Sequence, residues 1–196
     1  NNHKTTRYLL ELAVEKQCKL FFASTSEVYG DSQKIAPNED DDLAVHAHLG
    51  GRSAYTLSKL YSEHQCLNFH HTYGLPVVVG RFFNTVGVRQ CAEFGMVVPK
   101  FINQAMAGQP ITVYGNGKQT RAFSEVSDTV NAVLRLIDSP EAYGQIFNIG
   151  NPKEVTIREL AEFIKKATDS QSPIIHFPMP EERVGKKDIF FRKPCI

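Results

Sequence analysis

The chain has 196 residues, of which 42% are hydrophobic, and its 22 basic and 21 acidic side chains leave a formal net charge of +1 at pH 7. This balance excludes the basic footprint of a nucleic-acid-binding protein or of a protein held on an anionic membrane surface, and no apolar stretch reaches membrane length. The composition is that of a globular protein, the size of one large domain or of a piece of a larger one.

Hydrophobic periodicity predicts helices and strands that alternate along the chain. An amphipathic helix is expected around Leu9 and Leu12, and a long helical pattern runs from about Ser53 to Gly74, a residue suited to end a helix. Three more helices are predicted, at 97–108, 127–137 and 157–168. Strands are predicted at 19–25, 75–83, 111–115, 120–126, 145–150 and 173–177. Such alternation indicates an α/β fold with a doubly wound, mainly parallel sheet.

Cysteine and histidine spacing gives neither a disulfide framework nor a metal site. The four cysteines lie far apart without a C-x-x-C pair, which is typical of reduced thiols in a cytoplasmic protein: Cys18, Cys66, Cys91 and Cys195. No helical i, i+4 histidine pair has an acidic partner, so no metal is expected. The chain opens with the pattern of the middle of a helix, and we therefore expect residues before Asn1.

The stretch STSEVYG, residues 24–30, places hydroxyls, a carboxylate and a phenol directly after a predicted buried strand. Ser, Thr and Gly gather wherever a chain turns, so a simple turn is one interpretation. The other interpretation is chemical, because ligands of open parallel sheets bind just beyond the carboxyl ends of the strands.

Tyr55 and Lys59, in the motif YTLSK, share one face of the long predicted helix because they are four residues apart. A phenol titrates at about pH 10, and it accepts a proton at neutral pH only where a nearby cation stabilises the phenolate. The pair is a candidate acid/base, with a surface lysine beside a half-buried tyrosine as the alternative. Tyr114 and Lys118 have the same spacing, but the glycines between them cannot sustain a helix.

Five ordered motifs together resemble the extended short-chain dehydrogenase/reductases that modify nucleotide sugars, the NAD-dependent epimerase/dehydratase family: STSEVYG, YTLSK, RFFNTVG, ITVYGNGKQTRAF and FRKPCI. The resemblance covers essentially the whole chain. It implies the remaining half of a Rossmann-like NAD-binding domain over residues 1–84. Residues 85–196 would be a smaller, mainly substrate-binding α/β region with elements that return to the Rossmann domain. NAD is the implied cofactor, and a nucleotide sugar, first of all a UDP-sugar, the implied substrate.

The resemblance also implies roles for the residues after the first strand and in the long helix. In the family, bound NAD removes hydride from C4 of the sugar while a tyrosine takes the hydroxyl proton. Tyr55 matches that base, Lys59 its partner, and both would contact the cofactor; Thr25 matches a hydroxyl bonded to the same oxygen. Ser26 and Glu27 stand where some members act near C5 and C6, with a solvated carboxylate as the alternative for Glu27.

A sugar-nucleotide site is implied in the second half of the chain, where Arg suits a diphosphate because its guanidinium donates two hydrogen bonds. The matching residues are Asn84, Tyr114, Gln119, Arg121, Arg183 and Arg192. One family feature is absent from the sequence, the G-x-x-G-x-x-G turn that holds the NAD pyrophosphate. The chain alone is therefore expected to be inactive.

Three functions remain open. The first is a UDP-glucose 4-epimerase-like activity; the second is decarboxylation of UDP-glucuronate or another nucleotide-sugar dehydratase reaction; the third is nucleotide-sugar binding without turnover. The Thr-Ser-Glu run is similar to decarboxylases and GDP-mannose dehydratases, while Ser26 departs from dTDP-glucose dehydratases. Met96 stands where many decarboxylases have a basic residue, and a methionine cannot pair with the glucuronate carboxylate, which places the epimerase first. The family usually dimerises through the Tyr55 helix and the helix before it, so a homodimer is expected.

Overall fold

A three-stranded parallel sheet forms the centre of the larger of the two units of the molecule. Its strands lie in the order β1 (Leu20–Thr25), β2 (Val77–Phe82) and β7 (Ile146–Ile149). The computed structural model describes residues 2–30, 34, 36–45, 51–92, 96–179 and 193–195, of which 51 and 52 are described by their backbone only. β7 comes from beyond residue 84 and lies beside β2 in this sheet.

The register of this sheet brings the three strand ends level. Thr25 pairs with Phe82, and Phe82 pairs with Ile149, so each strand reaches its last residue at the same edge. Because all three strands are parallel, the residues that follow them gather at the carboxyl edge, where open α/β sheets bind ligands.

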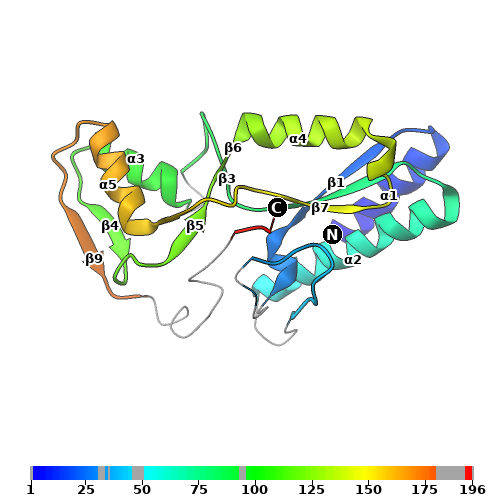
Figure 1. Cartoon of the computed structure of the whole chain (residues 1–196), viewed down its shortest axis with the longest axis horizontal. Helices are drawn as coiled ribbons and strands as arrows, with labels where there is room; N and C mark the ends of the chain where they lie inside the picture. Colours follow the sequence, from blue (N-terminus) through cyan, green and yellow to red (C-terminus); the bar gives the residue numbers. More distant parts are fainter. Residues whose placement is uncertain are drawn as a thin grey trace.

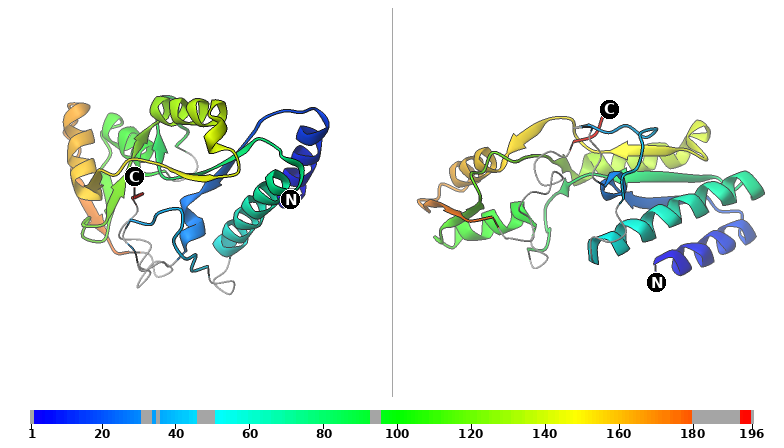
Figure 2. Two further views of the ribbon diagram at one scale, coloured as in Figure 1. Left: turned by 45° about the vertical axis from the view of Figure 1, so that its right-hand side comes forward. Right: turned by 90° about the horizontal axis from the view of Figure 1, so that it is seen from below.

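Helices cover both faces of this sheet, which makes it doubly wound as predicted. α1 (Asn2–Glu15) and α2 (Gly51–Tyr73) lie on one face and α4 (Val126–Asp138) on the other (Figures 1 and 2). The side chains between α1, α2 and the sheet form a buried apolar cluster: Leu10, Ala13, Cys66, Phe69, Leu75, Val77 and Val79. Gly74 follows α2 with φ +65°, the left-handed conformation that glycine adopts without strain.

A second, smaller unit contains α3 (Val97–Met106) and α5 (Ile157–Ala167), packed on short strands (Figure 1). β4 (Ile111–Tyr114) pairs in parallel with β9 (Ile174–Phe177), and β5 (Thr120–Ala122) pairs antiparallel with β8 (Glu154–Thr156). β3 (Thr85–Val86) and β6 (Ser124–Glu125) form a parallel pair between the two units. A 3-10 turn, η2 (Pro140–Ala142), follows α4.

The predicted helices and strands are confirmed, with three corrections. The segment 120–126 is not one extended piece, because β5 and β6 have different partner strands. β3 lies within the predicted polar loop, and β8 lies where the sequence indicated no strand. Strands of two or three residues were not predicted because they carry no periodicity of their own. α2 begins at Gly51, inside the predicted loop. A capping box starts α5: Thr156 Oγ1 accepts from the Glu159 N–H at 3.0 Å and Glu159 Oε2 accepts from the Thr156 N–H at 2.8 Å.

The four cysteines are free in the structure. Burial raises the pKa of the Cys66 thiol to about 12, and the neighbouring charge of Glu63 acts in the same direction, so this thiol is inert. Within the described residues, no helix combines the length and the apolar character needed to cross a membrane.

Candidate active site

The polar run after β1 leaves the sheet as a short 3-10 helix, η1 (Ser26–Tyr29). Thr25 precedes it in an extended conformation, and its Oγ1 accepts a hydrogen bond from the Glu27 N–H at 3.3 Å. Thr25 is buried, whereas Ser26 and Glu27 are partly exposed. A turn is present, as the simpler interpretation requires. It lies at the carboxyl edge of the sheet, however, and its bond to Thr25 uses the hydroxyl oxygen and leaves the hydroxyl proton available to a ligand.

Lys59 connects α2 to the end of β1. Its Nζ donates to the carbonyl oxygen of Ala23 at 2.7 Å and lies 5.0 Å from the centre of the Phe22 ring. Burial lowers the pKa of Lys59 from its usual value. The lysine is therefore anchored on the strand and does not simply extend into solvent, as the alternative interpretation would have it.

Tyr55 lies one turn before Lys59 near the start of α2, which packs against both β1 and η1. Its ring centre is 6.0 Å from Lys59 Nζ, and 43% of its surface is exposed. A phenol open to a ligand, beside an ammonium held on the neighbouring strand, has the chemistry of a general acid/base. Helix, strand and 3-10 turn thus bring Tyr55, Lys59 and the Thr25–Glu27 run to one edge of the sheet.

The second Tyr-Lys pair is separated by a turn. Tyr114 is the last residue of β4, and Gly115 and Gly117 have φ values of +68° and +72°, which no helix contains. Lys118 is exposed in that turn. The prediction that this pair does not share a helical face is confirmed.

The residues predicted to bind the nucleotide lie around β5, and three of them donate side-chain hydrogen bonds to backbone carbonyls. Asn84 Nδ2 donates to the Ala122 carbonyl at 3.0 Å, Gln119 Nε2 to the Tyr114 carbonyl at 2.9 Å, and Arg121 Nη1 to the Thr120 carbonyl at 2.6 Å. Tyr114 is 39% exposed, with Lys100 Nζ 5.0 Å from its ring centre. Arg183 and Arg192 lie outside the described residues.

Three buried polar atoms in this region have no hydrogen-bond partner among the described residues. They are the side-chain oxygens of Gln90, Gln119 and Ser124. Ser124 pairs with Thr85 across β3 and β6, and Gln90 Nε2 donates to the Thr85 carbonyl at 3.3 Å, so two of the three are close neighbours. Buried polar groups are normally bonded, and these atoms are therefore suited to meet the donors of a ligand or of water. Gln90 and Ser124 were missed in the sequence because a single polar residue in a loop or a short strand carries no signal.

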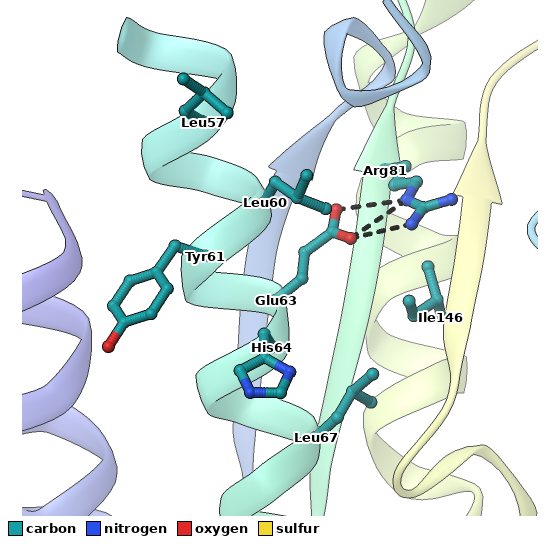
Figure 3. A pocket seen from close by; sticks show the side chains of 8 residues that line it. All are labelled: Leu57, Leu60, Tyr61, Glu63, His64, Leu67, Arg81 and Ile146. Atoms are coloured by element: carbon teal, nitrogen blue, oxygen red, sulfur yellow. Dashed lines mark hydrogen bonds and ion pairs between the residues drawn. The ribbon is translucent and has the colours of Figure 1, made fainter. Parts of the chain in front are cut away.

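A buried ion pair joins α2 to β2 one helical turn after Lys59, and the sequence analysis missed it too. Glu63 of α2 and Arg81 of β2 have side chains that are each 3% exposed, and Arg81 Nη2 lies 2.9 Å from Glu63 Oε2 (Figure 3). The Ser24 hydroxyl also donates to Glu63. Burial opposes the charge of Arg81, but the hydrogen bond and charge of Glu63 outweigh it and raise the pKa of Arg81. An Arg within the apolar run LPVVVGRFF was the available signal, since a buried charge needs a partner.

Comparison with known proteins gives consistent matches. The model of the NAD dependent epimerase/dehydratase family matches residues 1–150. A UDP-N-acetyl-alpha-D-glucosaminuronate decarboxylase of Bacillus cytotoxicus is 41% identical over 201 residues, which cover 100% of this chain and 60% of that protein. A UDP-glucuronic acid decarboxylase 1 of Danio rerio is 41% identical over 188 residues, or 96% of this chain and 44% of that protein.

A solved structure shares the fold as well. The UDP-glucose 4-epimerase of Thermotoga maritima, determined with UDP-glucose, has a TM-score of 0.83 and 25% sequence identity, and the match covers 97% of this chain and 59% of that one. The chain therefore spans about half the length of these three proteins, from 44% to 60%.

Proposed function

This chain belongs to the NAD-dependent epimerase/dehydratase family, and from that membership we propose that the full-length protein decarboxylates a UDP-uronic acid. The observation that carries the proposal is the 41% identity, over the whole chain, to a protein named as a UDP-N-acetyl-alpha-D-glucosaminuronate decarboxylase. The 4-epimerase with a similar structure is 25% identical. The 4-epimerase interpretation of the sequence is not confirmed, and its decarboxylase alternative has the better support.

The position of Met96 weakens the sequence argument against decarboxylation. Met96 immediately precedes α3 as its N-cap residue, and 50% of its surface is exposed. A half-exposed side chain does not line a closed pocket, so a substrate carboxylate near it would keep contact with water. The missing positive charge at position 96 therefore destabilises a bound carboxylate less than it would in a sealed site.

The residues of the chain supply proton transfer in the proposed reaction. Tyr55 takes the proton of the sugar 4-hydroxyl, Thr25 donates a hydrogen bond to the same oxygen, and the Lys59 ammonium stabilises the phenolate. NAD, when bound, supplies the hydride acceptor for C4. The resulting 4-ketone is beta to the C6 carboxylate, so the C5–C6 bond breaks, carbon dioxide leaves, and the electron pair moves into the C4 carbonyl. A proton added to C5 gives a 4-ketone shortened by one carbon. The hydride held by NAD would then return to C4 while Tyr55 gives its proton back to the C4 oxygen, which would complete the shortened UDP-sugar.

The residues present fit the nicotinamide end of NAD, because Tyr55 and the strand-bound Lys59 lie at the carboxyl edge of a parallel sheet. No G-x-x-G-x-x-G turn for the pyrophosphate occurs in these 196 residues. We therefore expect the 196-residue chain by itself to bind NAD weakly or not at all in calorimetry, with the full-length protein as the positive control. Micromolar binding by the isolated chain would mean that the cofactor site has been placed wrongly.

The reaction is tested by incubating the full-length protein and NAD separately with UDP-glucuronate, UDP-N-acetylglucosaminuronate and UDP-glucose. One of the two uronates is expected to give stoichiometric carbon dioxide and the UDP-sugar shortened by one carbon, while UDP-glucose stays unchanged. Arg192→Ala is expected to abolish carbon dioxide release, because the family resemblance places Arg192 in the sugar-nucleotide site. Lys193→Ala, which removes an ion pair with Glu154 at 3.2 Å, is the matched control and should retain carbon dioxide release.

Two outcomes of that incubation would contradict the decarboxylase. Conversion of UDP-glucose to UDP-galactose, with no carbon dioxide from either uronate, would establish the epimerase instead. Binding of the UDP-sugars without any turnover would establish the non-catalytic paralogue.

We also propose a homodimer that packs α1 and α2 against the same helices of a second copy. Apolar residues are exposed on these two helices: Tyr8, Leu9, Leu12, Leu57 and Tyr61. A division into a Rossmann part over 1–84 and a substrate part over 85–196, and a cytoplasmic location, remain further proposals. The four free cysteines are consistent with that location.

A further inference from the structure

One face of α2 contacts two consecutive residues of β1. Lys59 and Glu63 are one helical turn apart, so they share this face. Lys59 Nζ donates to the carbonyl of Ala23, and Glu63 accepts from the hydroxyl of Ser24, the next residue along the strand. The helix that carries Tyr55 is thus held on the strand that ends at Thr25 by two directional bonds.

Glu63 also fixes α2 to the rest of the sheet. Arg81 of β2 approaches its carboxylate with three N···O contacts of 2.9 to 3.3 Å. The far side of Arg81 donates to the Glu39 carbonyl at 3.2 Å, and its guanidinium lies 4.8 Å from the centre of the Tyr29 ring in η1. Every arm of this buried network has a partner, which is the condition under which such networks specify one geometry.

Apolar packing leaves room on this side of α2. Leu57, Leu60, Leu67 and Ile146 line an open cavity of about 490 Å³ beside the ion pair (Figure 3). Apolar contacts are non-directional and tolerate small shifts of a helix, whereas hydrogen bonds between charged groups do not. Glu63, like Lys59, therefore adds directional bonds to the apolar packing of α2 on the sheet.

We propose that Glu63 is a positioning residue, which holds α2 through Ser24 and Arg81 so that Tyr55 and Lys59 face the end of β1. The inference rests on the proposed function in taking Tyr55 as the base. Its effect should appear in kcat, because a misplacement of about 1 Å can cost on the order of a hundredfold in rate. The KM for the nucleotide sugar should hardly change, since the residues expected to bind the nucleotide lie around β5.

The mildest test removes the strand side of this link in the full-length protein. Ser24→Ala deletes the donor to Glu63 and leaves the ion pair with Arg81 intact. Ser62→Ala is the matched control, because Ser62 is also buried and its hydroxyl donates only within α2, to the Ser58 carbonyl at 2.9 Å. We expect Ser24→Ala to lower kcat about tenfold with KM changed less than twofold, and Ser62→Ala to change neither.

A second variant removes the link without leaving a buried charge. In Glu63→Leu/Arg81→Met both charges are absent, so the protein is expected to fold, and kcat should fall at least tenfold at a temperature well below the melting transition. Hydrogen exchange of residues 53–60, measured without NAD or substrate, should be faster in Ser24→Ala and in the double variant than in wild type or Ser62→Ala. Wild-type kcat and exchange in both variants would overturn the inference, as would a loss of kcat that only follows the melting temperature.

The exchange measurement also separates the two proposals. If the substrate assignment is wrong, the wild-type protein releases no carbon dioxide from UDP-uronates, while exchange in the amino-terminal turns of α2 still increases in Ser24→Ala. If the positioning role is wrong, the wild-type protein decarboxylates normally and exchange in these turns is the same in Ser24→Ala as in wild type.

Discussion

Tyr55→Phe in the full-length protein is expected to lower the rate of nucleotide-sugar conversion by a hundredfold or more, the usual order for removal of a general acid/base. The substitution removes one hydroxyl and keeps the ring, so the 6.0 Å contact between the ring and Lys59 Nζ can persist. With 43% of Tyr55 exposed, little packing depends on it, and stability should be unchanged. Binding of the nucleotide sugar, measured by calorimetry, should stay within a few fold of wild type.

Tyr61→Phe is the matched control for this prediction. Tyr61 lies on the same helix with 52% of its surface exposed, and its ring contacts His3 at 5.9 Å without reaching the carboxyl edge of the sheet. Its turnover should equal that of wild type. Turnover of Tyr55→Phe within a factor of two of wild type would refute the role of Tyr55 as the acid/base of the reaction.

The helix and strand pattern was accessible from the sequence because each long element has its own periodicity. α2 and α5 combine apolar spacing with a terminating glycine or a capping box, and β2 is an uninterrupted apolar run. β3 and β8 were not accessible, because strands of two or three residues exist only through pairing with distant partners. The same holds for the level ends of β1, β2 and β7, which depend on register.

The candidate acid/base pair could be proposed from the sequence because four-residue spacing on a helix is a local property. Tyr55 and Lys59 needed no tertiary information, and the glycines between Tyr114 and Lys118 were enough to reject the second pair. The bond from Lys59 to Ala23 and the link from Glu63 to Arg81 join residues far apart in the chain. The sequence ranking that placed the epimerase first is not confirmed, since the reactions proposed to follow C4 oxidation share these residues and the ranking rested on Met96 alone.

Breaking the buried Glu63–Arg81 ion pair is expected to lower the free energy of unfolding strongly. Arg81→Met leaves the Glu63 carboxylate buried without its cation, and such a loss costs about 3–5 kcal/mol. The variant should unfold at a clearly lower urea concentration, with the same dependence of unfolding free energy on urea if the folded and unfolded states are otherwise unchanged. The single hydrogen bond from the Ser24 hydroxyl cannot replace the guanidinium as the partner of the buried Glu63 carboxylate.

An exposed pair of the same length separates burial from mere proximity. Arg158 Nε lies 2.9 Å from Glu162 Oε1 on α5, the same distance as in the buried pair, but the two side chains are 64% and 53% exposed. Arg158→Met should therefore cost no more than about 1 kcal/mol. In Arg81→Met/Glu63→Gln no charge is buried and the Gln amide oxygen can still accept from Ser24, so more than half of the lost stability should return. If Arg81→Met and Arg158→Met unfold at the same urea concentration, the Glu63–Arg81 link is not the buried constraint on α2 that its geometry indicates.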